Sequence, residues 1–225
     1  MKNNQIVMHQ ISPNDLVDMS TMSSANIYRI ELSYAHDDNI LFSERIYKEN
    51  ARLYLHKTLA NIVEKAALKA REHQCRLILY DGLRTTTAQK KMLETRAVKD
   101  NPHWLQEPRL LSPPGAGAHP RGMAIDVSLE TLDGQLLDMG TAFDFLSPDP
   151  SPQANPAHRE YNHGESIRKN RALLDSIMLG AANEENIDLM PLPQEWWDYR
   201  MQPKVYSQFV ALSDNDLPEA MKMCD

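Results

Sequence analysis

The 225-residue sequence predicts an α+β fold, in which a small antiparallel sheet carries helices packed on one side, within a single domain covering residues 1–225. Two observations predict this class. Segments with the 3.6-residue hydrophobic period of helices and short segments with strand patterns follow one another, without an internal repeat. The composition, 42% hydrophobic and 24% charged, is that of an ordinary globular domain with a sizeable core.

The first half of the chain predicts two strands and two helices. Residues 26–34 alternate polar and apolar side chains, as a strand does. Residues 51–73 repeat apolar side chains near the helical period beneath a charged outer face, which indicates a core helix. Residues 76–80 form a short buried strand whose end delivers Arg84 to a loop, where functional side chains tend to project. A second helix is expected over residues 85–98, with a threonine cap at its start.

The middle of the chain predicts a turn followed by a strand that aims a carboxylate at a cleft. Residues 113–119 are small and turn-rich, so the backbone can approach a ligand closely. The strand over residues 123–129 places Asp126 on one face with small side chains, opposite a purely apolar face. Residues 132–134, Leu-Asp-Gly, are typical of a hairpin turn.

The last third of the chain predicts an irregular segment, a helix and a strand. Residues 146–167 are expected to form an irregular loop or lid, because four prolines between positions 148 and 156 interrupt any periodicity. A third helix is expected over residues 168–182 and a final strand over residues 194–199.

The charge balance argues against nucleic-acid and membrane partners and favours a small substrate. A net charge of −7 does not fit a polyanion-binding surface. No stretch approaches the ~20 apolar residues that cross a bilayer, and the start of the chain has no apolar leader segment. Cys75 is expected to be a reduced core thiol, and two distant cysteines are no disulfide framework. We therefore expect a cytoplasmic protein, with export by a route without such a leader left open; the oligomeric state stays open as well.

The first candidate metal ligands are His119 and Asp126, which lie seven residues apart. An imidazole and a carboxylate suit a divalent cation such as zinc, and a third protein ligand would leave one position open for water or a substrate carbonyl. That arrangement is what a hydrolase needs. The same pair is also common at surfaces and in ordinary hydrogen bonds, so the spacing alone leaves both interpretations open.

Four motifs in one order carry a resemblance to a known family. They are Tyr80-Asp-Gly-Leu-Arg84, the segment His119 to Asp126, Asp138-Met-Gly-Thr-Ala-Phe-Asp144, and Glu195-Trp-Trp. Together they resemble the D-alanyl-D-alanine dipeptidases, which are VanX-type zinc D,D-dipeptidases, over most of the chain. The resemblance implies the same α+β fold and a small dipeptide substrate.

The resemblance also implies a role for each matching residue. His119 and Asp126 would hold zinc, and Glu195 would be the general base. Arg84 would stabilise the tetrahedral intermediate, and Asp144 would bind the free amino group of the substrate.

Two positions depart from the family pattern. Asp198 stands where the family has the third zinc-binding histidine, and Gly117 stands where it has a substrate-contacting serine. Asp198 can still ligate a metal through oxygen, as a third ligand, or it can form an ordinary salt bridge. Two carboxylates would cancel the charge of the metal and move its preference from Zn²⁺ toward Mn²⁺ or Fe²⁺.

Two functions remain open at this point. One is a metallodipeptidase acting on D-Ala-D-Ala or a related short D-amino-acid dipeptide. The other is a non-catalytic descendant that binds a peptide or cell-wall fragment after losing the third histidine. Asp81 is expected to close a turn by bonding nearby backbone amides, and His158 and His163 are expected to be solvated loop residues rather than metal ligands.

Overall fold

A computed structural model describes residues 8–22, 26–107 and 109–225, and shows two sheets and five α-helices in that part of the chain. The larger sheet has five strands in the order β2-β4-β5-β7-β6, and the smaller pairs β1 with β3. The strands are β1 Leu16–Asp18, β2 Tyr28–Ile30, β3 Tyr54–His56, β4 Cys75–Asp81, β5 Ala124–Thr131, β6 Leu189–Pro191 and β7 Asp198–Met201. The helices are α1 Lys57–Glu72, α2 Thr86–Glu94, α3 Arg96–Asp100, α4 Glu165–Glu184 and α5 Pro203–Tyr206.

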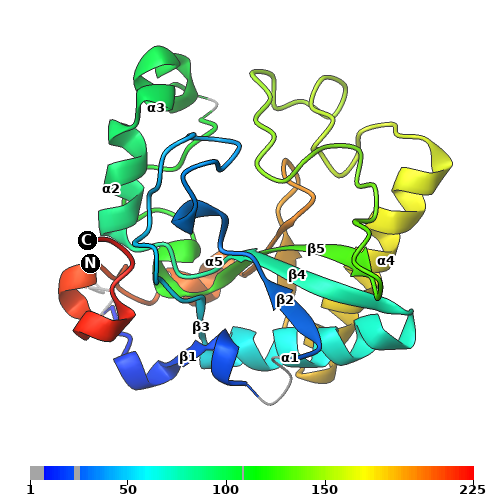
Figure 1. The fold of residues 1–225 in the computed structure, drawn as a ribbon, viewed down its shortest axis with the longest axis horizontal. Coiled ribbons are helices and arrows are strands. Elements are labelled where there is room, and N and C mark those ends of the chain that lie inside the picture. Colours follow the sequence, from blue (N-terminus) through cyan, green and yellow to red (C-terminus); the bar gives the residue numbers. More distant parts are fainter. Residues whose placement is uncertain (1–7, 23–25, 108) are drawn as a thin grey trace, which may run out of the picture.

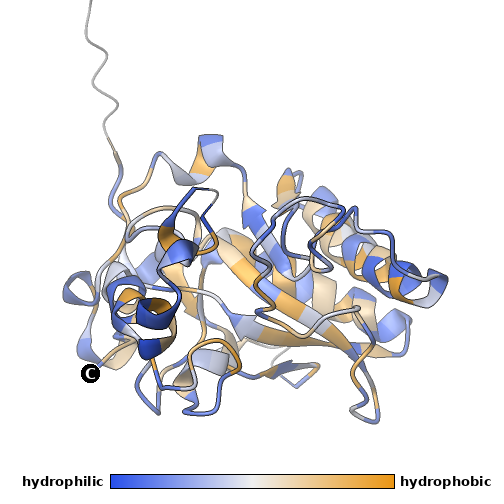
Figure 2. Cartoon of the chain, turned by 90° about the horizontal axis from the view of Figure 1, so that it is seen from above, coloured by the Kyte–Doolittle hydropathy of each residue, from blue (hydrophilic) through white to orange (hydrophobic). Residues whose placement is uncertain are grey.

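Helices α1 and α4 pack against each other and under one face of the larger sheet, while α2, α3 and long loops lie on its other side (Figure 1). The α+β class is therefore confirmed. All neighbouring strands are antiparallel except β2, which runs parallel to β4. The central strands carry many hydrophobic residues among hydrophilic ones, and α4, at the right of the view, carries many hydrophilic residues (Figure 2).

Helix α1 is shorter than the helix predicted over residues 51–73. Its buried side repeats at the expected period, with Leu59, Ile62, Val63 and Ala66 each fully buried. The chain before it, however, pairs as β3 with β1, and the ring of His56 accepts a hydrogen bond from the first turn. Residues 54–56, which the local pattern assigns to the helix, therefore form a strand because they pair with a distant segment.

The helix predicted over residues 85–98 is divided into α2 and α3 at Thr95. The backbone of Thr95 is extended, with φ −63° and ψ 157°. Its hydroxyl donates to Met92 O, at the end of α2, and accepts from Val98 N, at the start of α3. A threonine can satisfy backbone groups in this way and so compete with helix continuation.

Other boundaries shift by a few residues. The strand predicted over residues 26–34 is limited to β2, and the strand predicted over residues 194–199 begins only at Asp198. Helix α4 begins at Glu165 rather than residue 168, so the irregular segment ends earlier than predicted. The hairpin after β5 is confirmed, with Gly134 at φ +88° and Thr131 N donating to Gln135 O.

Cys75 is buried and free of any disulfide, as predicted. Within residues 8–22, 26–107 and 109–225, no helix is long and apolar enough to span a bilayer. Residues 1–7, which include most of the start of the chain considered above, lie outside the described part.

Candidate active site

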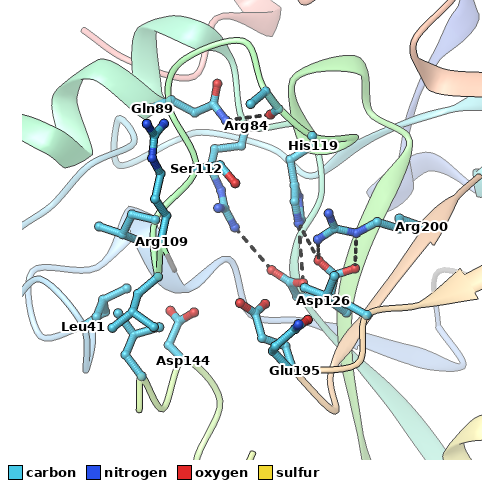
Figure 3. A pocket seen from close by; sticks show the side chains of 18 of the residues that line it. Leu41, Arg84, Gln89, Arg109, Ser112, His119, Asp126, Asp144, Glu195 and Arg200 are labelled. Atoms are coloured by element: carbon cyan, nitrogen blue, oxygen red, sulfur yellow. Dashed lines mark hydrogen bonds and ion pairs between the residues drawn. The ribbon is translucent and has the colours of Figure 1, made fainter. Parts of the chain in front are cut away.

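A polar pocket of about 300 Å³ is lined by side chains that converge from several segments of the chain (Figure 3). Side chains from α2, from the loop before His119, from the loop around Asp144 and from β7 line it. The structure brings all six residues singled out from the sequence to this one pocket: Arg84, His119, Asp126, Asp144, Glu195 and Asp198.

Strand pairing places two buried carboxylates opposite each other. In the antiparallel pair of β5 and β7, Asp126 lies directly across from Asp198, and each residue is only 1% exposed. Like charges facing each other across a strand pair repel, and burial strengthens that repulsion. This pair of strands therefore requires positive charge between or beside the two carboxylates.

His119 supplies the imidazole beside these carboxylates. It begins a short 3₁₀ turn that ends at Gly122, where φ is +62° and a Cβ would lie 2.9 Å from the backbone nitrogen of His56. Only glycine fits such a position without strain. The ring atom Nδ1 lies 2.8 Å from Gly82 O. Because a carbonyl oxygen only accepts hydrogen bonds, Nδ1 carries the hydrogen, and Nε2 is the atom that faces the carboxylates.

The ligand atoms around Nε2 have the spacing of a metal site. Nε2 lies 3.3 Å from Asp198 Oδ2 and 3.6 Å from Asp126 Oδ1. Ligands about 2.1 Å from a tetrahedral metal stand about 3.4 Å apart. Asp126 Oδ1 is also buried and has no hydrogen-bond partner among the described residues. A buried carboxylate oxygen without a partner is costly, so the donor set fits a divalent cation on the Nε2 side of the ring.

The electrostatic environment of His119 also favours a bound cation. Burial and the nearby Arg84 oppose a positive charge on the ring, but the carboxylates of Asp126 and Asp198 outweigh them and raise the pKa of His119 to about 10. Without a metal, a proton on the imidazole therefore partly balances the negative charge of the two carboxylates. A bound cation would take over that role, since metal ligation requires the neutral ring.

Asp81 offers a second possible grouping with His119 and Asp126, whose ligand atoms all lie within 4.8 Å of one another. However, Asp81 lies on the Nδ1 side, 3.6 Å from that atom, which is already bonded to Gly82. Its carboxylate accepts a 2.7 Å hydrogen bond from Tyr47 and pairs with Arg84. We therefore assign Asp81 to orienting Arg84. The expectation that it bonds backbone amides is wrong, because side chains have taken its oxygens.

Arg84 is held by three contacts at the edge of the pocket. Its Nε and Nη2 atoms contact Asp81, Nη2 lies 3.3 Å from Asp126 Oδ2, and the guanidinium stacks over the Tyr34 ring at 5.2 Å. Neighbouring anionic groups hold the pKa of Arg84 well above its usual range, although burial opposes this. A cation fixed in this way can stabilise negative charge that develops on a bound substrate.

Glu195 lies in the turn that leads into β7, with its carboxylate toward the pocket (Figure 3). Burial is the largest cause that raises its pKa to about 7, and the carboxylates of Asp198 and Asp126 add to the shift. No described residue forms an ion pair or a side-chain hydrogen bond with it. A carboxylate with this pKa can exchange protons near neutral pH.

Asp144 is a buried carboxylate without a cationic partner in the described part of the chain. Its Oδ1 accepts a 3.0 Å hydrogen bond from the Tyr34 hydroxyl. Burial, reinforced by Asp126, raises the pKa of Asp144 well above its usual range. An ammonium group brought by a ligand would relieve this cost.

Among the pocket residues that sequence reasoning missed, Tyr34 and Arg200 bond directly to predicted site residues. Arg200 holds both oxygens of Asp198: Nε donates to Oδ1 at 2.7 Å and Nη2 donates to Oδ2. The available signal was strand alternation, which places residues two apart, such as Asp198 and Arg200, on one face of β7. Tyr34 lies far from the motifs in the sequence and carried no comparable signal.

The two spare histidines do not reach the pocket. His158 is buried and its ring accepts a hydrogen bond from Glu160 N, so the expectation that it is solvated is wrong. His163 is half-buried and contacts Pro156 O at 2.7 Å. Both rings therefore fix the backbone of the irregular segment.

Comparisons with known proteins find similarity to peptidases. Residues 12–213 match the family model Peptidase_M15, described as D-ala-D-ala dipeptidase. The D-alanyl-D-alanine dipeptidase of Escherichia coli (strain K12) is 29% identical over 191 residues, which cover 83% of this chain and 84% of that protein.

Two solved structures are also similar. The Serratia marcescens L-Ala D-Glu endopeptidase ChiX has a TM-score of 0.39 and 14% identity, covering 68% of this chain and 84% of its own. The LD-carboxypeptidase LdcB has a TM-score of 0.40 and 16% identity, covering 96% of this chain and 80% of its own.

The fold and the site together define a hydrolase-type centre, in which buried carboxylates surround one imidazole. The chain belongs to the M15 peptidase family of D-Ala-D-Ala dipeptidases.

Proposed function

We propose that this protein is a metal-dependent dipeptidase that hydrolyses D-Ala-D-Ala or a related short D-amino-acid dipeptide. The observation that carries the proposal is Oδ1 of buried Asp126 in a member of this family. This oxygen has no hydrogen-bond partner among the described residues and lies 3.6 Å from Nε2 of His119. His119, Asp126 and Asp198 would hold the cation. Zinc is the first candidate, and the second carboxylate favours Mn²⁺ or Fe²⁺ more than a two-histidine site would.

Glu195 and Arg84 would each have a role in hydrolysis. A divalent cation held there would supply Lewis acidity, which makes a peptide carbonyl more electrophilic and a water more acidic. Glu195 takes a proton from the attacking water and passes it to the leaving amine, and its pKa of about 7 suits both steps. Arg84 stabilises the negative charge that develops on the carbonyl oxygen.

Asp144 determines which end of the substrate enters. Its buried carboxylate is held by Tyr34 and has no cation to balance it within the described chain. A free ammonium group of a dipeptide supplies that charge, whereas an acylated amine does not. The proposal therefore requires a substrate with a free amino terminus.

A second candidate function follows from the pairing of Asp198 with Arg200. Arg200 uses both oxygens of Asp198 and so competes with a cation for the same lone pairs. In that case the pocket would bind a peptide or a cell-wall fragment without cleaving it. The two functions differ in metal content and in turnover.

The test is metal analysis and D-alanine release on the same preparation, purified without chelators. We expect about one metal ion per chain, and D-alanine release from D-Ala-D-Ala that stops on chelation and returns with Zn²⁺ or Mn²⁺. The variant Glu195→Gln should keep the metal and lose turnover. A protein that holds no metal at saturating concentration and releases no D-alanine would establish the binding function instead.

A further inference from the structure

One guanidinium nitrogen of Arg200 forms no hydrogen bond with the described part of the chain. Its Nε and Nη2 atoms are both taken by Asp198, which fixes the plane of the group. The remaining nitrogen, Nη1, has no such partner among the described residues and is not fully buried. Arg200 lines the pocket with 14% of its side chain exposed. The two N–H groups of Nη1 are therefore available to a ligand in the pocket.

The space beside Nη1 is kept open by Gly117. A Cβ built at position 117 would lie 3.9 Å from Nη1, so the missing side chain leaves room next to this nitrogen. The loop itself is fixed, because Arg121 donates to Gly115 O and Gly117 O, and Gln89 accepts from Gly115 N. Arg200 therefore contacts Asp198 on one side and lies next to Gly117 on the other.

Asp144 and Arg200 lie on opposite sides of the pocket. Figure 3 shows Asp144 on one side and Arg200 on the other, with Glu195 and Asp126 between them. A dipeptide carries an ammonium group at one end, a carboxylate at the other, and the scissile bond in the middle. The pocket is therefore complementary to the ligand in charge, with Asp144 at the ammonium end and Arg200 at the carboxylate end.

We infer that Arg200 is the residue that recognises the free carboxylate of the dipeptide, through Nη1, and that it thereby sets the specificity for short substrates. This inference rests on the proposed function and adds to it a requirement for a free carboxyl terminus. Guanidinium groups suit this role because they form charge-assisted hydrogen bonds with carboxylates in fixed directions. Asp198 holds the guanidinium in place and so makes Arg200 a preorganised donor.

Arg109 is the matched control, because it is another arginine of the same pocket. It pairs with Glu107 at 2.9 Å and its side chain is 43% exposed. In Figure 3 it lies on the left of the pocket, whereas Arg200 lies on the right. An exposed, long side chain with its own surface partner is a weaker carboxylate anchor.

The experiment compares binding of D-Ala-D-Ala and D-Ala-D-Ala amide by calorimetry, in Zn²⁺-loaded protein carrying Glu195→Gln to prevent turnover. We expect the carboxylate form to bind at least ~10-fold more tightly than the amide, the scale of one charged hydrogen bond. Arg200→Gln should bring the ratio close to one, while Arg109→Gln should leave it unchanged. Arg200→Lys keeps a cation for Asp198 but removes Nη1, so it should also lower the ratio in a folded protein.

Three outcomes would overturn the inference. If Arg200→Lys and Arg200→Gln weaken both ligands by the same factor, Arg200 only positions Asp198. If the ratio disappears with Arg109→Gln instead, the carboxylate binds at Arg109. If neither ligand binds to the Glu195→Gln protein at all, the proposed function fails together with this inference, which distinguishes that failure from the first two.

Discussion

The ion pair between Asp198 and Arg200 is the part of the site whose energy can be measured most cleanly. Asp198 is 1% exposed and the side chain of Arg200 14% exposed, and both Asp198 oxygens are used. Removing one partner of a buried pair leaves an uncompensated charge, at a cost of about 3–5 kcal/mol. Asp198→Asn and Arg200→Gln should each lower the free energy of unfolding by that amount, or the melting temperature by about 6–20 °C.

The assay is urea unfolding in the presence of a chelator, followed by circular dichroism for both single variants and for the double variant. The double variant should lose about 2–3 kcal/mol less than the sum of the single losses. Arg52→Gln is the control, because Arg52 makes a 2.8 Å contact with Asp18 but is 57% exposed, and should cost less than about 1 kcal/mol. Single losses that add to within ~0.5 kcal/mol of the double loss would refute the reasoning.

Three further predictions concern the reaction. Glu195→Gln should lower kcat by at least ~100-fold without loss of bound metal, and retained turnover would remove Glu195 from the chemistry. Since burial raises the pKa of Glu195 to about 7 and the base acts when deprotonated, kcat/KM should rise with pH along an acid limb. The midpoint should lie at or below about 7, because a bound cation favours the carboxylate, and a rate that falls as pH rises toward neutrality would contradict this. N-acetyl-D-Ala-D-Ala should be a poor substrate, and Asp144→Asn should remove the preference for the free amine; equal wild-type rates on both would indicate an open cleft.

Local sequence patterns predict the parts of the site that depend on local structure. The small, glycine-containing turn and the alternation of the following strand place His119 and Asp126 correctly on one pocket. The helical period of α1 also survives, because its buried side packs on the sheet. In each case the pattern and the tertiary structure favour the same conformation.

The parts that could not be predicted depend on contacts between distant segments. Asp126 and Asp198 lie opposite each other because of the register of β5 against β7, which no local pattern specifies. The contacts of Tyr34 with Asp144 and of Tyr47 with Asp81 join residues 110 and 34 positions apart. The interpretation of Asp198 as ligand or as salt bridge also stayed open, because it depends on Arg200 and on the depth of burial.

The central claim is that one divalent cation binds on the Nε2 side of His119. Anomalous X-ray diffraction from crystals of the Zn²⁺-loaded protein tests it most directly. We predict a single metal peak about 2.0–2.2 Å from Nε2 of His119 and from carboxylate oxygens of Asp126 and Asp198. A peak on the Nδ1 side shared with Asp81, or no peak in this pocket at saturating Zn²⁺, would contradict the claim.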